Sequence, residues 1–229
     1  MSNLIDRDKK CAAEAAAALV EPGMTVGLGS GSTAEQMIRA LGARVRAGLD
    51  VRAIATSPAA ETLARAQGIR LTSFEEVAEL DLAMDGADEV DPQLRLIKGA
   101  GGALLREKIV AHAASVFVIA VDASKLVERL GRGQVPVEVV RFGWQRAAAA
   151  VVDAGGQPTL RAIGPGGAPF VTAEGHYILD CRFGPLAAPE ALGRALDGIV
   201  GVVEHGLFLD LADKVVVGEG GVTRILQRA

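Results

Sequence analysis

Short apolar runs alternate with longer helix-forming segments along the first half of the chain. The runs predict strands at 24–28, 51–56, 69–71, 80–85, 95–98 and 116–122. The segments between them predict helices at 6–20, 33–45, 59–67 and 103–113. Asp6 is the expected N-cap of the first helix. Strands that alternate with helices in this way favour an open, mostly parallel sheet with helices on both faces, a Rossmann-like α/β arrangement.

The order of elements changes after Val121. Strands are expected at 137–140, 158–162, 176–181 and 201–208, and helices at 144–154 and 189–198. This β-α-β-β-α-β order is typical of a smaller, ferredoxin-like α+β domain. The segment DKVVVGEGG, 213–221, is expected to rejoin the first sheet. We therefore predict an α/β catalytic domain of residues 1–130 with 207–229, and an α+β domain of residues 131–206.

The composition limits the classes of binding partner. Half of the 229 residues are hydrophobic but only 3% are aromatic, so stacking platforms for single-stranded nucleic acid are not expected. Lys and Arg number 24 against 28 Asp and Glu, which gives a formal charge of −4. Such a chain has no general field that attracts DNA or RNA, so an anionic ligand must be held locally.

Cysteine use and hydropathy favour a cytoplasmic protein. Cys11 and Cys181 match no disulfide framework and no metal-ligand spacing. The N-terminal segment MSNLIDRDKK is not followed by a signal-peptide pattern. No apolar run reaches the roughly 18 residues that a membrane span needs. We expect a soluble protein without a membrane partner.

The first motif with chemical potential is GLGSGST, residues 27–33, between a predicted strand and a predicted helix. Its glycines allow backbone N–H groups to point outward, and the helix N-terminus favours an anion such as a phosphate. A dinucleotide is disfavoured because Ser32 takes the place of the third glycine, and because Thr56 and Ser57 end the next strand where an acid would hold the ribose. A tight turn that binds nothing remains the alternative.

The second motif is the acidic cluster DGADEVD, residues 85–91, which directly follows an apolar strand. Ligands of open parallel sheets bind beyond the carboxyl ends of the strands, where this cluster is expected. Closely spaced carboxylates could hold a hard cation, but the spacing matches no known calcium loop. A solvated acidic turn is the other alternative.

The third motif is KGAGG, residues 98–102, followed by a helix that carries Glu107. Lys98 at a strand end can neutralise a phosphate or a developing oxyanion. Glu107 could face back toward the loop, although a surface carboxylate paired with neighbouring bases is the commoner arrangement. Because all three motifs are expected at one end of the same sheet, together they indicate acid–base chemistry on a small phosphorylated metabolite.

Four blocks of the sequence, in this order and spacing, resemble the signatures of ribose-5-phosphate isomerase, type A. The blocks are GLGSGSTA, DGADEVD, KGAGGALLREKIV and VDASKLVERLG, and the likeness extends to PVEVV and GVVEHGLF. The resemblance implies interconversion of ribose 5-phosphate and ribulose 5-phosphate without a cofactor or metal. One departure is Ala100, which interrupts a run of glycines usual in the family.

The resemblance also implies a role for individual residues. The substrate-binding set is Ser30, Gly31, Ser32, Thr33, Asp85, Gly86, Ala87, Asp88, Lys98, Gly99, Ala100, Gly101 and Lys125. The catalytic set is Glu107, Asp85, Asp88 and Lys98, and Lys9 is a weaker match near the phosphate. Glu107 corresponds to the general base of an enediolate mechanism, provided that substrate binding excludes water around it. Lys98 would stabilise the enediolate, Asp85 would open the furanose ring and relay protons, and Asp88 would orient Asp85 or a hydroxyl.

Two other functions share parts of this pattern. A sugar-phosphate sensor would use the loops without Glu107, but no DNA-binding module is expected in this length. An acyl-CoA transferase-like enzyme would use a glutamate as a covalent nucleophile. The Ala- and Val-rich second domain offers a subunit interface, so we expect a homodimer or homotetramer. The sequence does not separate a role in the pentose phosphate pathway from one in carbon fixation.

Overall fold

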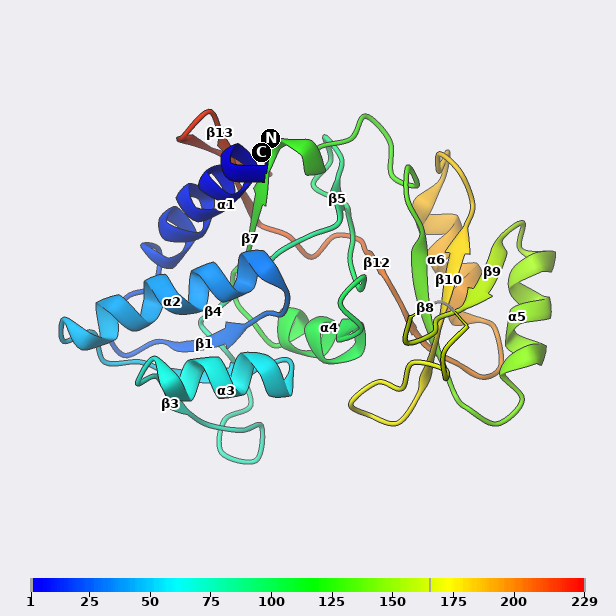
Figure 1. Cartoon of the computed structure of the whole chain (residues 1–229), viewed down its shortest axis with the longest axis horizontal. Coiled ribbons are helices and arrows are strands. Elements are labelled where there is room, and N and C mark those ends of the chain that lie inside the picture. Colours follow the sequence, from blue (N-terminus) through cyan, green and yellow to red (C-terminus); the bar gives the residue numbers. More distant parts are fainter. Residues whose placement is uncertain (1, 165, 229) are drawn as a thin grey trace. The chain divides into compact units, whose positions relative to one another are not determined.

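The computed structural model describes residues 2–164 and 166–228 and divides into two compact units (Figure 1). Unit 1 comprises the chain up to Ala87, Arg106–Leu126 and the chain from Asp210. Unit 2 comprises Asp88–Leu105 and Val127–Leu209. Our expected division put residues 88–105 in the first domain, whereas the structure groups them with unit 2. The boundary between independently folding domains stays a prediction.

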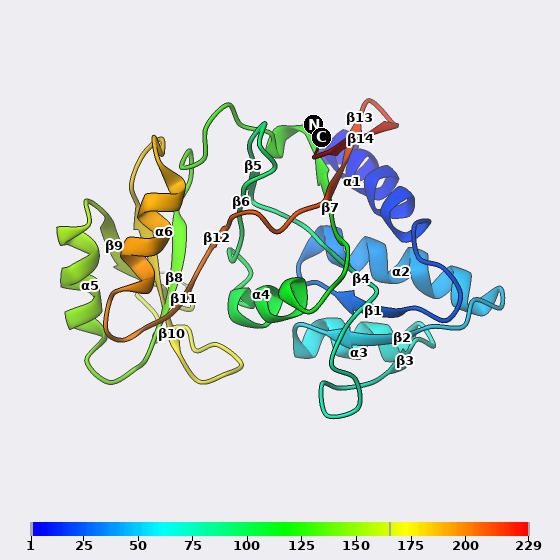
Figure 2. The same ribbon diagram turned by 180° about the vertical axis from the view of Figure 1, so that it is seen from behind.

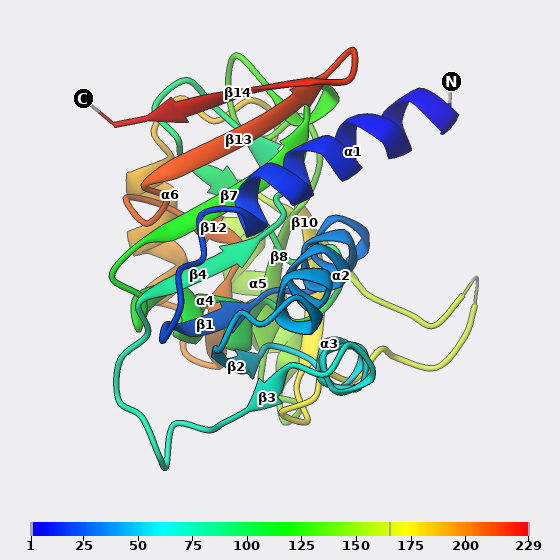
Figure 3. The same ribbon diagram turned by 90° about the vertical axis from the view of Figure 1, so that its left-hand side faces the viewer.

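Unit 1 is built on a seven-stranded sheet with the order β14-β13-β7-β4-β1-β2-β3. Its strands are β1 (Thr25–Leu28), β2 (Arg52–Ala55), β3 (Arg70–Leu71), β4 (Leu82–Asp85), β7 (Phe117–Asp122), β13 (Lys214–Glu219) and β14 (Val222–Gln227). Neighbouring strands are parallel except β13 and β14 (Figure 3). The open, mostly parallel sheet is confirmed, and the segment after unit 2 does rejoin it as β13.

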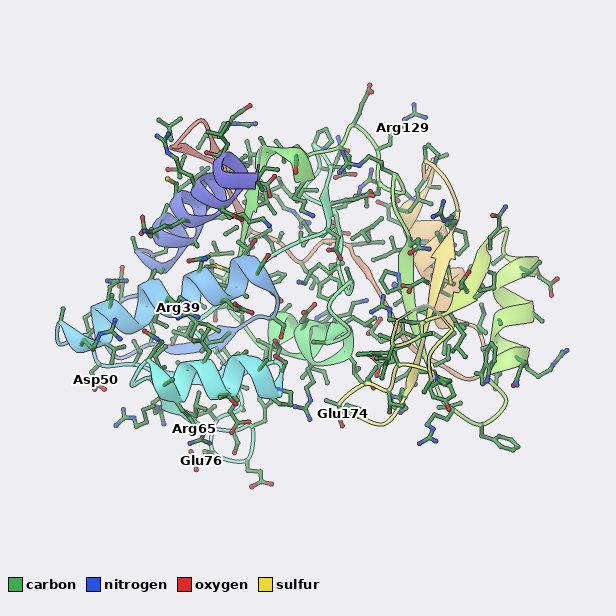
Figure 4. All side chains as sticks on the ribbon, in the orientation of Figure 1. Arg39, Asp50, Arg65, Glu76, Arg129 and Glu174 are labelled. Atoms are coloured by element: carbon green, nitrogen blue, oxygen red, sulfur yellow. The ribbon has the colours of Figure 1, made fainter. Side chains whose placement is uncertain are left out.

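Helices lie on both faces of this sheet. The face covered by α1 (Ser2–Ala17), α2 (Ser32–Arg46) and α3 (Pro58–Ala66) forms the main core, to which β1 contributes Val26 and Leu28. A side chain at position 27 would point to the other face, because successive strand residues alternate, and its Cβ would overlap Val110 of α4 (Leu104–His112). The polar faces of α2 and α3 carry exposed charged side chains such as Arg39 and Arg65 (Figure 4).

The first helix begins earlier than the sequence predicts. It starts at Ser2, so Asp6 is an exposed helical residue and the expected N-cap is wrong. Nothing between Ser2 and Asp6 breaks a helix, and the helix therefore extends toward the N-terminus. It ends at Ala17, before Pro22, and its alanines allow close approach to the sheet.

Unit 2 contains a four-stranded antiparallel sheet with the order β11-β8-β10-β9. The strands are β8 (Val135–Val139), β9 (Gln157–Leu160), β10 (Tyr177–Arg182) and β11 (Val202–His205). Val135, Val137 and Val139 alternate toward a core that they share with residues of α5 (Trp144–Asp153) and α6 (Pro189–Asp197) (Figure 2). This strand order and the intervening helices confirm the ferredoxin-like arrangement.

A second, three-stranded sheet in unit 2 was not predicted. It joins β5 (Glu89–Val90), β6 (Leu96–Ile97) and β12 (Leu207–Phe208) in antiparallel pairs. The apolar run at 95–98 therefore forms a strand, but outside the parallel sheet. β5 lies within the acidic cluster, where two-residue pairing leaves no recognisable pattern. Within residues 2–164 and 166–228, every helix is too short or too polar to cross a bilayer.

Candidate active site

The glycine-rich loop of unit 1 connects β1 to the N-terminus of α2. Gly31 is the N-cap of α2 and has a φ of 92°, a left-handed conformation that favours glycine. No side chain caps this helix, so the first amides of α2 are available to an anion. The hydroxyl oxygen of Ser30 lies 2.7 Å from that of Thr56, and Lys9 donates to the hydroxyl of Ser32 at 3.3 Å.

Asp85 ends β4 directly beside this loop. The side chain is buried, and its Oδ1 accepts hydrogen bonds from the Gly86 amide at 2.7 Å and from the Ser30 amide at 3.2 Å. A Cβ atom on Gly29 would overlap the Asp85 carboxyl group. Gly29 is therefore the residue that allows Asp85 to contact the loop backbone.

Lys125 follows the neighbouring strand. Asp122, the last residue of β7, accepts hydrogen bonds from the amide and the hydroxyl of Ser124, and so holds the short 3₁₀ helix Ala123–Lys125. The carboxyl ends of β7, β4 and β1 are adjacent in the parallel sheet. Unit 1 therefore brings Asp85 and the glycine-rich loop to one end of the parallel sheet, as predicted, together with Lys125. The expectation that residues 98–102 end a strand of the same sheet is wrong, because β6, which precedes them, pairs with β5 and β12.

Glu107 lies in the first turn of α4 and is only 4% exposed. This burial contradicts the alternative of an exposed surface carboxylate. A carboxylate is rarely buried to this extent in proteins, and such positions are often functional. The flanking residue Lys108 is buried as well, at 7% exposure.

Unit 2 supplies the remaining predicted residues. Lys98 is 3% exposed, and its ammonium group lies 5.4 Å from the centroid of the Phe208 ring. Asp88 is held through its backbone amide, which donates to Ile97 at 2.8 Å, and its Oδ2 accepts from the Ala100 amide at 3.0 Å. The loop 98–102 thus binds the Asp88 carboxylate through its backbone.

Ala100 fits this loop without strain. Gly99 and Gly102 have φ values of 104° and 83°, where side chains are disfavoured. Among the described residues, only Leu94 and Asp210 combine a positive φ with a side chain. Ala100 therefore has an ordinary backbone conformation and its side chain is exposed. An alanine at position 100 therefore needs no backbone conformation that favours glycine.

The other two carboxylates of the acidic cluster, Glu89 and Asp91, are buried and contact protein groups. Glu89 is buried and accepts from the amides of Gly131 at 2.7 Å and Gly133 at 2.5 Å. Asp91 is buried and forms an ion pair with Arg95 at 2.6 Å. The alternative of a solvated acidic turn is therefore wrong. These two carboxylates are engaged by amides and a guanidinium group, which also disfavours the cation alternative.

A pocket of about 390 Å³ in unit 2 contains two of the predicted residues. It is lined by Asp88, Glu89, Ala100, Arg132, Gly133, Gln134, Pro136, Arg161 and Asp180. Its volume is within the range of small-molecule sites. A pocket of similar size in unit 1, between α3, β3 and α4, contains none of the predicted residues.

Comparison with known proteins decides the family. Residues 52–221 match the family described as ribose 5-phosphate isomerase A (phosphoriboisomerase A). The chain belongs to the ribose 5-phosphate isomerase A family. A ribose-5-phosphate isomerase A from Thermomicrobium roseum is 52% identical over 98% of this chain and 95% of the relative.

Solved structures of ribose 5-phosphate isomerases agree in fold. The enzyme from Methanocaldococcus jannaschii is 40% identical and superposes with a TM-score of 0.92, covering 96% of this chain and 98% of that one. A D-ribose-5-phosphate isomerase in complex with phospho-erythronic acid is 37% identical, with a TM-score of 0.94 and coverage of 98% and 99%. As a member of the ribose 5-phosphate isomerase A family, this chain is an isomerase.

One further group of side chains in unit 2 has the composition of a metal site. Asp197, Glu204 and His205 place one potential ligand atom each within 4.8 Å of one another. However, His205 Nδ1 accepts from the Leu207 amide, which puts the ring proton on Nε2, the atom 3.2 Å from Asp197. A metal-bound histidine normally donates through its other nitrogen. The geometry therefore does not fit a metal ligand.

Sequence reasoning missed Thr56 and Arg161, which contact predicted isomerase residues, and Asp180, which binds Arg161. Thr56 was noted only as the end of a strand, and its hydroxyl contacts Ser30. Arg161 and Asp180 lie in segments predicted as strands with no functional signal. Arg161 donates to the Gly99 carbonyl at 3.0 Å and to the Ala100 carbonyl at 3.1 Å.

Proposed function

We propose that this chain interconverts ribose 5-phosphate and ribulose 5-phosphate through an enediolate, with Glu107 as the general base. The observation that carries the proposal is the burial of the Glu107 carboxylate in the first turn of α4. Family membership supports the substrate pair. The relative in complex with phospho-erythronic acid supports a phosphorylated acid as a ligand of this fold. The planar, negatively charged carboxylate of such an acid resembles the planar, negatively charged C1–C2 group of an enediolate.

The proposed reaction moves one proton between two carbons. The Glu107 carboxylate takes the proton from C2 of the open-chain aldose, the C–H electron pair forms the C1=C2 double bond, and the carbonyl electrons move to O1. Glu107 then returns the proton to C1, while the O2 proton passes to O1 through Asp85, so that O1 becomes the hydroxyl group and O2 the ketone oxygen. The net change is a shift of hydrogen without an external oxidant.

The other predicted residues bind substrate and stabilise charge. The amides and hydroxyls of Ser30, Gly31, Ser32 and Thr33 hold the phosphate at the α2 N-terminus, with Lys9 and Lys125 adding positive charge. Lys98 stabilises the enediolate oxygens. Asp85 relays protons during ring opening and between O1 and O2. Asp88 orients a sugar hydroxyl, and Gly86, Ala87, Gly99, Ala100 and Gly101 contribute backbone groups.

Isomerisation in D₂O tests the enediolate. Purified protein and ribose 5-phosphate are incubated in D₂O, and the deuterium at C1 of the ketose and at C2 of recovered aldose is measured by NMR. A base that exchanges its proton with solvent incorporates deuterium at these positions. Glu107→Gln retains size but cannot accept a carbon-bound proton, so kcat and exchange should both fall, by about 10²- to 10⁴-fold.

Glu14→Gln is the matched control. Glu14 is exposed on α1, and its substitution removes the same charge as Glu107→Gln. Near wild-type isomerisation and exchange in Glu107→Gln would assign the base elsewhere, with Asp85 the next residue to replace. No ketose from the wild type would instead favour the sensor. A thioester trapped on Glu107 with an acyl-CoA would favour the transferase.

We also infer that the chain assembles as a homodimer or homotetramer in the cytoplasm. Phe142 and Val200 of unit 2 are 95% and 94% exposed, and the hydrogen bond from Val140 to Gly201 brings their segments together. Exposed apolar groups of this kind favour a subunit contact. Light scattering should give a dimer or tetramer mass, and Phe142→Ser with Val200→Ser should shift it toward the monomer. A monomeric wild type contradicts this inference.

A further inference from the structure

Arg161 of unit 2 binds the backbone of the 98–102 loop through the carbonyl oxygens of Gly99 and Ala100. It lies just after β9, and its own backbone is fixed by hydrogen bonds with Ile178 and Phe170. The guanidinium group is 14% exposed and lies 5.8 Å from the centroid of the Phe170 ring. Arg161 is therefore held in place from both its backbone and its side chain.

Asp180 of β10 fixes the direction of the guanidinium group. Nε of Arg161 donates to Asp180 Oδ2 at 2.9 Å, and Nη2 donates to Oδ1 at 2.5 Å. This two-point geometry is specific to arginine, because a lysine ammonium cannot present two parallel donors. With Nε and Nη2 engaged, Nη1 points at the carbonyl oxygens of Gly99 and Ala100.

The Gly99–Ala100 peptide connects Arg161 to Asp88. The carbonyl of this peptide accepts from Arg161 Nη1 at 3.0 Å, and the N–H of the same peptide donates to Asp88 Oδ2 at 3.0 Å. A peptide whose carbonyl accepts a charged donor becomes a better donor itself, because hydrogen bonds in a chain polarise one another. The φ of 104° at Gly99 sets the orientation of this peptide.

We propose that Arg161 is a positioning residue for Asp88 that acts through the Gly99–Ala100 peptide. This inference rests on the proposed function, in which Asp88 orients a sugar hydroxyl. A series of hydrogen bonds fixes the rotamer of the Asp88 side chain. It runs from Asp180 to Arg161, then through the Gly99–Ala100 peptide to Asp88. The hydrogen bond from Ala100 uses Oδ2 of Asp88. Oδ1 can then accept from a sugar hydroxyl in the 390 Å³ pocket that Asp88 and Arg161 both line.

A double-mutant cycle tests the connection. Arg161→Lys keeps the charge but loses the two-point contact, and Asp88→Asn removes the carboxylate. We expect each to lower kcat, Arg161→Lys by up to about 10²-fold, since small misplacements of a catalytic group have effects of that size. The double variant should be little worse than Asp88→Asn alone, because both changes disable the same group. If the loss of kcat in the double variant equals the product of the losses in the two single variants, the proposal is overturned.

Arg182→Lys is the matched control, since Arg182 is an exposed arginine at the end of β10. Asp180→Asn should resemble Arg161→Lys in lowering kcat more than it raises KM. Thermal unfolding of each variant is measured in parallel. A lower Tm with unchanged kcat would assign Arg161 a structural role only and would overturn the proposal.

An NMR measurement makes the test independent of catalysis. Labelling with ¹³C-carbonyl glycine and ¹⁵N-alanine selects the five Gly–Ala peptides of the sequence, at 42–43, 86–87, 99–100, 102–103 and 167–168. Arg161→Lys and Asp88→Asn should both shift the Ala100 amide proton upfield, and Arg182→Lys should not. An unmoved Ala100 signal in Arg161→Lys overturns the proposal even if the enzyme is an isomerase. If Asp88→Asn retains full activity while the signal moves, the hydrogen-bond series stands and the role proposed for Asp88 fails.

Discussion

Gly29 and Asp85 are in contact across the parallel pair β1 and β4, with the Asp85 carboxyl occupying the space where a side chain on residue 29 would lie. The carboxylate can therefore accept a hydrogen bond from Ser30 in the glycine-rich loop. The loop that we assign to the phosphate and the aspartate that we assign to proton relay consequently share one set of contacts. Displacing one must displace the other.

Gly29→Ala should lower both catalysis and stability. The added methyl group pushes the Asp85 carboxyl out of position, and kcat/KM should fall by about 10- to 100-fold, while overpacking destabilises by about 1–3 kcal/mol. Steady-state kinetics and urea unfolding measure the two effects. Gly198→Ala is the control, because Gly198 has a φ of −77° and only ordinary contacts beyond 3.4 Å. Equal kinetics in both variants would show that the Gly29 contact is not needed.

Lys98→Ala should weaken both substrate binding and turnover. One positive charge would serve the bound anion and the enediolate, and removing such a stabiliser typically lowers the rate by about 10²-fold or more. Lys98→Met, which keeps most of the buried stem, separates the loss of charge from the loss of packing. Lys214→Met on β13 controls for loss of charge elsewhere. An unchanged kcat/KM in a folded Lys98→Met variant would remove the lysine from the mechanism.

Activity should survive exhaustive chelation. The proposed reaction uses Lys98 and backbone amides where other enzymes use a divalent cation, so no step requires a metal. Rates are compared before and after dialysis against EDTA, and again after addition of Mg²⁺, Mn²⁺ or Zn²⁺. Loss of activity that one of these ions restores would contradict the prediction.

Cys181 should resist alkylation in the folded protein. Burial in the unit 2 core, helped by the nearby Asp180 charge, raises the pKa of its thiol to about 12 from the ordinary 9.0. At pH 8.5, iodoacetamide should label Cys181 only after denaturation, as measured by mass spectrometry of the peptide. Rapid labelling of Cys181 in the native protein would contradict the burial.

The same thiol should affect stability at high pH. Because the folded-state pKa is raised, the stabilising contribution is fully present below about pH 9 and is lost as the pH rises from about 9 toward 12. Urea midpoints of wild type and Cys181→Ala should therefore converge between pH 8 and pH 10.5. A constant difference across that range would show that the thiol does not titrate as described.

Local pattern was sufficient to predict most of the architecture. Strands such as β1, β4 and β7 are buried along their whole length, so their apolar runs identify them. β14 was not predicted, because it is an exposed edge strand whose residues VTRILQ lack a buried face. β5 was missed because the contact that buries Glu89 comes from residues 131–133, far along the sequence.

Contacts between residues far apart in the sequence also limited prediction of the site. The glycine-rich loop and Asp85 lie at the carboxyl ends of adjacent strands, so the topology of a parallel sheet is enough to associate them. Arg161 could not be predicted, since its link to Asp88 depends on the backbone conformation at Gly99 and on a partner in another strand, Asp180. Arg161 binds backbone carbonyls of the 98–102 loop, and every residue has such a carbonyl. The loop sequence therefore gives no sign of this contact.

The position of β13 has a consequence for synthesis. β13 lies between β7 and β14 in the unit 1 sheet, but it is translated after the whole of Val127–Leu209. Until residues 214–219 leave the ribosome, β7 is an open edge strand with unpaired amides and carbonyls. A nascent chain therefore already contains the glycine-rich loop, Asp85, Lys98 and Glu107 while its sheet is unfinished. A ribosome stalled within unit 2 would expose an edge on which chaperones or other nascent chains can pair.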